Sequence, residues 1–423
     1  MQVLLLNPRS EFLQDPAFVP PLGLLYLGTA LEANEFDVKV ADLNIPDTRI
    51  DGHDPRLIGI SCVTANFAAV RDLVTECRRM YPGVPVVVGG PHLSVKPWDA
   101  ERLGANWGGD GDCEEKMLYL ASTLRKGFDV PAGRLPDWGD VDVNRYPFPA
   151  RHMVPIHEYA CQLDGEPATS IVGQRGCPFA CAFCSRWTGS RKVRARAVEN
   201  VIEEIRQIKA LGFRSVVFHD DEMNLLNDRL IDLCRDLAPE QIRFKANARA
   251  DLFTSEQAEA LAAAGCSWLC FGVESGNARI LKTARKGTTP QINAQARRIC
   301  RDAGIKFKAF VIVGLPGETR ETVEETRRWL IENEVDDLTV TMFVPFPGSD
   351  VYARPDKYDI QFTLGYETRP LPFRGGTGLN LPHTTRTAGL SAEELAEMPE
   401  RIEYEVRLEL GTAKTYQGAP ERQ

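Results

Sequence analysis

Several features are missing from this chain, and each absence excludes a class of protein. The 423 residues contain no apolar run of about eighteen residues, so no segment is predicted to span a membrane. The opening MQVLLLNPRSEF lacks the basic start of a signal peptide, and we expect a cytoplasmic protein. A formal net charge of −9 argues against a general nucleic-acid-binding protein, because phosphate binding needs a basic surface.

A disulfide framework is also missing, although the chain has eleven cysteines. All but one trio are widely scattered, and an intracellular chain keeps its thiols reduced. Several lie in apolar patterns, where a thiol behaves as a small hydrophobic group: Cys62, Cys234, Cys266, Cys270 and Cys300. The content of 43% hydrophobic and 26% charged residues is typical of a globular enzyme, and the length predicts two or three domains.

Residues 1–134 alternate strand and helix patterns. The short apolar runs QVLLLNP, DVKVADL, LIGISCVT and PVVVGG resemble buried parallel strands, and Phe67–Met80 has the helical period. The predicted fold is α/β, an open doubly wound parallel sheet whose ligands bind outside the carboxyl ends of its strands. Residues 135–165 contain several prolines and little periodicity, which indicates a linker.

Residues 166–350 carry a second and more regular alternation. It contains six strand–helix steps, enough for a partial TIM-like barrel with its chemistry at the strand carboxyl ends. The predicted helices cover Val198–Leu211, Leu225–Leu237, Glu256–Ala264, Gln291–Ala303 and Glu321–Glu334.

Residues 351–423 are predicted to form a small C-terminal α-rich extension. Its helix runs from Ser391 to about Leu410 and begins with a capping box in which Glu394 is the third helical residue. We expect this extension to close the barrel mouth over the substrate, with Tyr358, Tyr366, Arg374 and His383 as its polar and aromatic residues.

The densest chemical signal is the trio Cys177, Cys181 and Cys184, spaced four and three residues apart. Thiolates are soft ligands that suit iron–sulfur clusters or zinc. A structural zinc site would need four ligands, and the nearest others, His152 and Cys161, lie in the linker without ligand-like spacing. Three cysteines leave one iron of a cubane open to substrate. The alternatives are three buried cysteines or zinc with a distant fourth ligand.

This CxxxCxxC motif after the first strand of a six-fold run resembles the radical S-adenosylmethionine superfamily. The resemblance implies a 4Fe-4S cluster whose open iron binds the amino and carboxylate groups of S-adenosylmethionine. Reduction then yields a 5′-deoxyadenosyl radical, and the cofactor carries the difficult chemistry. An electron donor such as flavodoxin or ferredoxin is implied as partner.

The resemblance extends to the binding of S-adenosylmethionine. Phe183 matches the aromatic residue that lies against the adenine. FHDDE ends the second strand, where Asp220, Asp221 and Glu222 match polar groups on the methionyl amine; each could instead be a helix N-cap.

Two later motifs complete this resemblance. In GVES, Glu274 and Ser275 resemble a ribose-binding pair. In VIVGLPGE, Val313 and Gly314 match the backbone that brackets the adenine, since glycine allows close approach. Two basic pairs also match, although each could simply be on the surface: Arg194 with Arg196, and Arg285 with Lys286.

The N-terminal half resembles the cobalamin-binding domain of one radical S-adenosylmethionine subgroup. The segments that carry this likeness are PPLGLLYLGTALE, IGISCVTANF, VVVGGPH and GGDGDCEE. Ser61, Thr64, Gly89 and Gly90 follow strands, where small residues would admit a nucleotide-like tail. The alternative is a domain kept for packing alone.

One departure from cobalamin proteins concerns the lower axial ligand. Many of them supply a histidine from a D-x-H-x-x-G loop, and this chain has none. Asp51-Gly-His53 does not continue the motif, and His92 in GGPH is a loose candidate for cofactor contact. The subgroup commonly lacks the motif, so cobalamin is still predicted.

The combined resemblance predicts a cobalamin-dependent radical C-methyltransferase acting on a small molecule. The main alternative is a non-methylating dehydratase, deoxygenase or cyclase with the same layout. A non-catalytic sensor and a transfer-RNA methylthiolation enzyme are further alternatives; the latter would normally carry extra cysteine ligands and an RNA-binding tail. No residue is assigned as a catalytic acid, base or hydrogen donor.

Overall fold

The chain divides near residue 160 into two units, which are described separately. The structure is a computed structural model that describes residues 1–11, 13, 15–185, 192–362, 366, 385–387 and 389–412. The N-terminal unit is built mainly from Met1–Ala160, and Tyr366 belongs to it. The C-terminal unit contains Cys161–Cys184 and most of the chain from Lys192 onward. The break falls inside the proline-rich segment 135–165.

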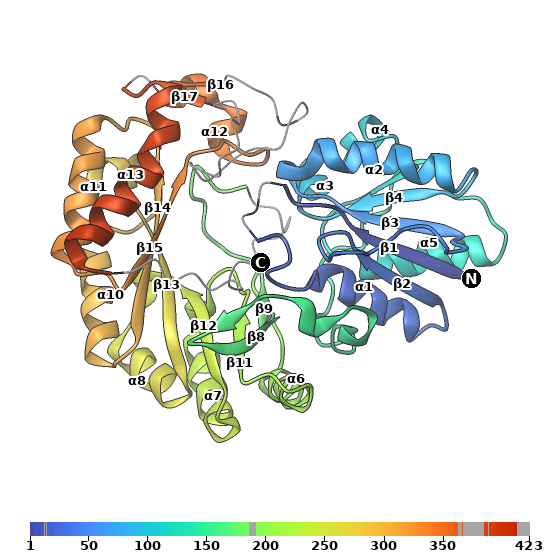
Figure 1. Cartoon of the computed structure of the whole chain (residues 1–423), viewed down its shortest axis with the longest axis horizontal. Helices are drawn as coiled ribbons and strands as arrows, with labels where there is room; N and C mark the ends of the chain where they lie inside the picture. The colour runs from blue at the N-terminus through green and yellow to red at the C-terminus, as the bar shows by residue number, and fades with distance from the viewer. Residues whose placement is uncertain are drawn as a thin grey trace. The chain divides into compact units, whose positions relative to one another are not determined.

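The N-terminal unit contains a parallel sheet in the strand order β2-β1-β3-β4-β5-β6 (Figure 1). The strand order reverses between β1 and β3. The carboxyl ends of these two strands therefore form the topological switch point of a doubly wound fold. The predicted fold class is confirmed. The strands are β1 Gln2–Asn7, β2 Asp37–Asp42, β3 Leu57–Ser61, β4 Val86–Gly89, β5 Trp107–Gly109 and β6 Gly133–Arg134.

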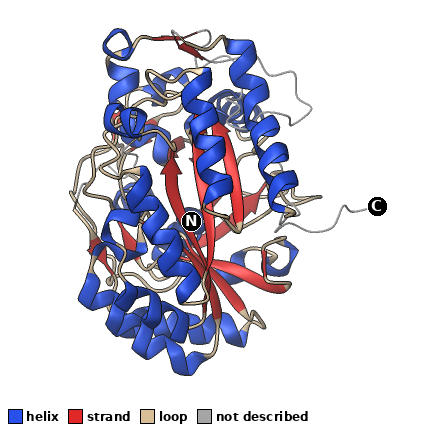
Figure 2. Ribbon diagram, turned by 90° about the vertical axis from the view of Figure 1, so that its left-hand side faces the viewer, coloured by secondary structure: helices blue, strands red, loops and turns tan. Residues whose placement is uncertain are grey.

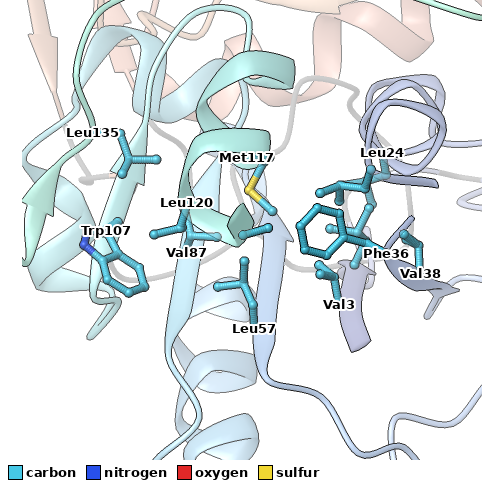
Figure 3. Packing of buried hydrophobic residues seen from close by; sticks show 13 residues of the cluster. Val3, Leu24, Phe36, Val38, Leu57, Val87, Trp107, Met117, Leu120 and Leu135 are labelled. Atoms are coloured by element: carbon cyan, nitrogen blue, oxygen red, sulfur yellow. The ribbon is translucent and has the colours of Figure 1, made fainter. Parts of the chain in front are cut away.

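Helices cover both faces of this sheet, which explains the continuous apolar runs in the sequence. On one face, α1 (Leu22–Glu32) and α5 (Glu114–Arg125) enclose a core in which Met117 lies over Leu57 and Leu24 lies beside Phe36 (Figure 3). The other elements of the unit include α2 (Phe67–Met80, the predicted bounds), α3 (Pro91–Val95) and α4 (Asp99–Arg102).

The C-terminal unit contains a curled sheet in the order β15-β14-β13-β12-β11-β8-β7. Six strands of this sheet, β8 and β11 to β15, are parallel. Within this sheet, only the edge strand β7 pairs antiparallel. This is the predicted partial barrel. The strands are β7 Gln162–Leu163, β8 Glu166–Ile171, β11 Ser215–Phe218, β12 Arg243–Ala248, β13 Cys266–Glu274, β14 Lys306–Val313 and β15 Asp337–Met342.

The helices of this unit lie on the outside of the curled sheet (Figures 1 and 2). Threonines set several starts, because the side chains of Thr254, Thr289 and Thr319 each accept a backbone N–H of the first turn. The predicted bounds hold to within two residues. The helices are α6 Val198–Ala210, α7 Asn227–Leu237, α8 Ser255–Ala263, α9 Ala278–Thr283, α10 Pro290–Asp302 and α11 Arg320–Glu332.

The C-terminal helix α13 (Ala392–Leu410) covers the edge strand β15. Its predicted capping box is present, with Ser391 and Glu394 exchanging side-chain-to-backbone hydrogen bonds. On its inner face, Glu403 accepts the β15 amide of Val340 at 2.7 Å, and Arg407 donates to the carbonyl of Leu338 at 2.7 Å. These side chains satisfy backbone groups that an open sheet edge would expose.

The predicted extension over the barrel mouth is only partly described. Tyr358 is buried in the C-terminal unit, between α12 (Asp350–Ala353) and the short hairpin of β16 (Ile360–Phe362) with β17 (Thr385–Thr387). Tyr366 belongs to the N-terminal unit, and its expected role in closing the barrel mouth stays a prediction. Arg374 and His383 lie outside the described residues. No helix that the structure describes is long and apolar enough to cross a membrane.

Candidate functional site

The three predicted ligand cysteines lie on one loop that follows β8. The loop is bounded by β9 (Gln174–Arg175) and β10 (Arg194–Ala195), which pair antiparallel. Cys181 is buried, Cys177 is half-buried and Cys184 is exposed. The loop backbone is also tied to the rest of the unit, because the amide of Ala182 donates to Ala284.

The donor set fits an iron–sulfur cluster. Although part of Cys184 is exposed, burial of its thiol raises the pKa to about 12, and the thiols of Cys181 and Cys177 lie close enough to add to the rise. Among the described residues, no three His, Cys, Asp or Glu side chains converge as closely as a single metal ion requires. A cubane is different, because each thiolate binds its own iron and the ligands lie farther apart.

Two carboxylates of the FHDDE segment brace the base of this loop. Asp220 accepts the amide of Gly173 at 2.6 Å, and Asp221 accepts the amide of Gly176 at 3.1 Å. Burial raises the pKa of Asp220 to about 6, while the backbone hydrogen bonds oppose the rise. Both side chains are therefore engaged by backbone that leads into Cys177.

Glu222 differs from these two neighbours. Its carboxylate accepts no hydrogen bond from any described residue, and it lies near the cations Lys286 and Arg249. Burial raises its pKa to about 7, and those two cations limit the rise. Of the three predicted amine-binding carboxylates, this one is the most available to a ligand.

The two residues of the predicted ribose-binding pair have different partners in the structure. Glu274 ends β13 in the left-handed region (φ 60°) and is buried, and Lys286 donates to its carboxylate at 2.8 Å. The Ser275 hydroxyl contacts the hydroxyl of Thr326 on α11 at 3.1 Å, and it accepts the amide of Asn277. The roles of both residues toward a ribose stay predictions.

The fifth-strand motif requires glycine at Gly314. Its φ is +92°, and an added Cβ would lie 2.7 Å from Leu395 of α13. The amides of Gly314 and Leu315 both donate to buried Glu318. Phe183 packs against an apolar cluster that includes Leu315, so the structure brings the cluster loop and this motif together.

The basic pairs have structural partners. Arg194 and Arg196 are buried, so a surface role is wrong for them. Arg196 pairs with Glu204 of α6 and donates to the carbonyl of Val172. Arg285 pairs with Asp350 at 2.7 Å.

The four residues predicted to contact cobalamin gather at the carboxyl edge of the N-terminal sheet. Ser61 ends β3 and is paired in register with Gly89, which ends β4. Thr64 begins the turn after β3. Gly90 has a φ of +102°, and an added Cβ would lie 3.0 Å from the carbonyl oxygen of Cys62. Only glycine fits this turn without displacing that backbone.

His92 lies beside this edge but has no free ring nitrogen. Its Nδ1 is 3.0 Å from the Thr64 hydroxyl, and its Nε2 is 3.0 Å from Asp99. Asp99 also accepts the Tyr366 hydroxyl at 2.6 Å. Burial lowers the pKa of the imidazole, although Asp99 opposes this. In this arrangement His92 cannot also serve as an axial ligand of cobalamin.

Comparisons with known proteins match both units. The profile of the Radical SAM superfamily matches residues 171–330, and that of the B12 binding domain matches residues 15–115. An uncharacterized methyltransferase of Pyrococcus horikoshii is 30% identical over 403 residues, which cover 86% of this chain and 85% of the relative. The chain belongs to the radical S-adenosylmethionine superfamily, in its cobalamin-binding subgroup.

Other similar proteins are consistent with this membership. The anaerobic magnesium-protoporphyrin IX monomethyl ester cyclase of Rubrivivax gelatinosus is 26% identical, covering 85% of this chain and 71% of the relative. The radical S-adenosylmethionine methyltransferase TsrM of Kitasatospora setae, solved with cobalamin and a [4Fe-4S] cluster, has the same fold. Its TM-score is 0.73 at 22% identity, covering 95% of this chain and 84% of TsrM.

The family membership confirms the predicted cofactors of this radical S-adenosylmethionine enzyme. They are a 4Fe-4S cluster, S-adenosylmethionine and cobalamin. Sequence reasoning missed Arg249, which contacts the cluster loop, and Glu318, which organises the fifth-strand turn. Arg249 directly follows β12, just as Glu274 is the last residue of β13. Its position at the carboxyl end of a strand could have marked it as a candidate site residue.

Replacing Cys177, Cys181 or Cys184 singly with alanine should abolish the cluster, because two thiolates hold a cubane poorly. Iron content and cluster absorbance after anaerobic reconstitution measure this. Cys300→Ala is the matched control, since Cys300 is a buried thiol on α10 and should leave iron unchanged. Full iron in any of the three variants would refute that cysteine as a ligand.

Glu318→Gln should remove a pH dependence of stability. Burial raises the pKa of Glu318 to about 8 from 4.5, so the folded state holds a proton that the unfolded state releases above pH 4.5. Stability should therefore fall between these values, by up to about 1.4 kcal/mol per pH unit, as pH rises. Glutamine keeps an acceptor oxygen without this slope.

Urea unfolding of both proteins at several pH values checks this. Glu332→Gln, an exposed glutamate of α11, is the control and should keep the wild-type slope. An unchanged slope in Glu318→Gln would contradict the buried, protonated carboxyl.

Proposed function

We propose that this enzyme is a cobalamin-dependent radical C-methyltransferase that acts on an unactivated carbon of a small molecule. The observation that carries the proposal is the presence, in one chain, of a three-cysteine cluster loop on a partial barrel and a cobalamin-type sheet with an open glycine edge. When bound, the cluster with S-adenosylmethionine supplies the radical, and cobalamin supplies the methyl group.

In this proposal, the barrel residues bind and orient S-adenosylmethionine. Glu222 would accept hydrogen bonds from the methionyl ammonium, since its carboxylate has no hydrogen-bond donor among the described residues. Asp220 and Asp221 would act one step away, by holding the loop base. Phe183 would lie against the adenine, with Val313 and Gly314 on the neighbouring turn. Glu274, positioned by Lys286, would contact the ribose.

The N-terminal unit would hold cobalamin at its carboxyl edge. Gly89 and Gly90 carry no side chains there, and Ser61 and Thr64 offer short hydroxyls beside them, so a nucleotide-like tail could approach the sheet. The Thr64 hydroxyl is already oriented by His92.

Two partners complete the proposal. Cleavage of S-adenosylmethionine to the radical would consume one electron, and the return of cobalamin to its methyl-accepting state would consume a second, so an external donor such as flavodoxin or ferredoxin would supply both. The substrate would be covered in part by the segment after residue 350, because Tyr358 packs in the same apolar cluster as Ala182 of the cysteine loop.

A second candidate function is a radical cyclase that transfers no methyl group. The similar cyclase of Rubrivivax gelatinosus favours it, since that relative aligns with 85% of this chain. The residues that would bind the cofactors are the same for both reactions, so product analysis must separate them.

The proposal predicts two products from S-adenosylmethionine. Reconstituted enzyme with cobalamin, a reductant and its substrate should form both S-adenosylhomocysteine and 5′-deoxyadenosine, and the substrate should gain the mass of a methyl group. Liquid chromatography with mass spectrometry measures all three. Deuterated substrate would label 5′-deoxyadenosine in either reaction.

The outcomes separate the candidates. Formation of 5′-deoxyadenosine without S-adenosylhomocysteine would refute methyl transfer and support the cyclase class. A reduced protein that never consumes S-adenosylmethionine would refute both and support a sensor.

Gly90→Ala should weaken cobalamin binding by about tenfold or more, because the left-handed conformation costs roughly 1–2 kcal/mol and the new Cβ presses on the Cys62 backbone at the binding edge. Gly83→Ala is the control. Gly83 also has a positive φ of +82° but nothing within 4 Å, and it lies before β4, at the other end of the strand.

Absorbance titration with cobalamin measures the affinities. Both variants should keep wild-type iron, since the cluster lies in the other unit. Equal affinities for the two variants would remove Gly90 from the proposed cobalamin site.

A further inference from the structure

Arg249 is a buried arginine that directly follows β12, at the carboxyl edge of the barrel sheet. Its backbone is held by Asn224, which accepts the Arg249 amide at 2.9 Å and donates to its carbonyl at 3.0 Å. Both backbone groups of Arg249 are therefore held by one side chain. None of the function described above uses this residue.

The guanidinium of Arg249 contacts the cluster loop in two ways. Its Nη1 lies 4.0 Å from the sulfur of Cys181. Its Cζ lies 3.5 Å from the centre of the Phe179 ring, so the planar group stacks on an aromatic residue of the same loop. Arginine suits this double contact, because it is planar and always charged.

The other edge of the guanidinium faces away from the sulfur. Nε and Nη2 donate to the two oxygens of Asp251 at 2.8 and 3.1 Å. Nη2 also donates to the carbonyl of Lys286, whose side chain pairs with Glu274. Arg249 therefore presents Nη1 to the Cys181 sulfur, while Nε and Nη2 bind the carboxylate of Asp251.

We propose that Arg249 is a positioning residue that holds the cluster loop and raises the reduction potential of the 4Fe-4S cluster. A reduced cluster carries one more negative charge than an oxidised one. A buried cation beside a ligand sulfur stabilises the reduced form more, because hydrogen bonds to the sulfurs, net charge and solvent exposure set these potentials. Burial strengthens the effect, since little water screens it.

Asp251 should have the opposite effect on the reduction potential of the cluster. It partly neutralises Arg249, so its negative charge should lower the potential that the arginine raises. The two residues are hydrogen-bonded to each other, yet their removal should move the potential in opposite directions. Other charges near Arg249 are Glu222, Lys286 and Glu274, and both variants retain them.

The experiment is a redox titration of the reconstituted full-length enzyme without substrate, cobalamin or S-adenosylmethionine, followed by electron paramagnetic resonance of the reduced cluster. At a fixed potential, Arg249→Gln should lower the ratio of reduced to oxidised cluster about tenfold, equivalent to 59 mV for a one-electron couple. Asp251→Asn should raise this ratio, and Arg249→Lys should fall between Arg249→Gln and the wild type.

Arg297→Gln is the matched control. Arg297 is also a buried arginine, and it lies 3.5 Å from the carboxylate of Asp336 and donates to the carbonyl of Glu334, on the outer side of the barrel. Its variant should keep the wild-type potential. Iron content per chain is measured for every variant, so that loss of cluster is separated from a shift in potential.

A merely structural role would lower iron content without moving the potential of the clusters that remain. A wild-type potential in iron-replete Arg249→Gln, or shifts of the same sign in Arg249→Gln and Asp251→Asn, would overturn the proposal. If Arg249→Gln binds no iron, the Asp251→Asn variant tests the proposal instead. A cluster potential in Asp251→Asn at or below that of the wild type would refute the proposal. Because no methyl transfer is measured, the result is independent of the proposed function.

Discussion

The cluster loop has its shape because carboxylates of the next strand hold its base. Asp220 and Asp221 follow β11, and each accepts a backbone amide from the segment that leads into Cys177. Buried carboxylates are costly unless hydrogen-bonded, so these contacts are hard to break without loss of stability. These two contacts hold the backbone that leads into the cysteine loop, so the placement of that loop depends on them.

Polar side chains around the carboxyl edge of the barrel are also held by hydrogen bonds. Most polar side chains there are already committed to partners: Glu274 to Lys286, Ser275 to Thr326, and Glu318 to two amides. Such commitments preorganise a site, because the groups need not rearrange when a ligand arrives. Glu222 stands apart, since its carboxylate has cations nearby but no hydrogen-bond donor among the described residues.

The N-terminal unit shows a comparable network at its own carboxyl edge. His92 links Thr64 to Asp99, and Asp99 also accepts the hydroxyl of Tyr366, which lies 267 residues later in the chain. Fully satisfied networks of this kind favour one arrangement of the side chains involved. This network accounts for the histidine of the GGPH segment without assigning it a cofactor ligand role.

The sequence by itself determined much of this enzyme. Apolar periodicity placed the helices that were predicted to within two residues, although it missed α5 and α9, and the spacing of Cys177, Cys181 and Cys184 identified the cluster, because both signals are local. Arg249 beside Cys181, and Tyr366 beside Asp99, were decided only by the tertiary structure. Each contact joins residues far apart in the chain, and no local pattern records which strand ends meet. For the same reason, the structure alone showed that Ser275 faces Thr326, while the carboxylate of Glu222 has no hydrogen-bond donor among the described residues.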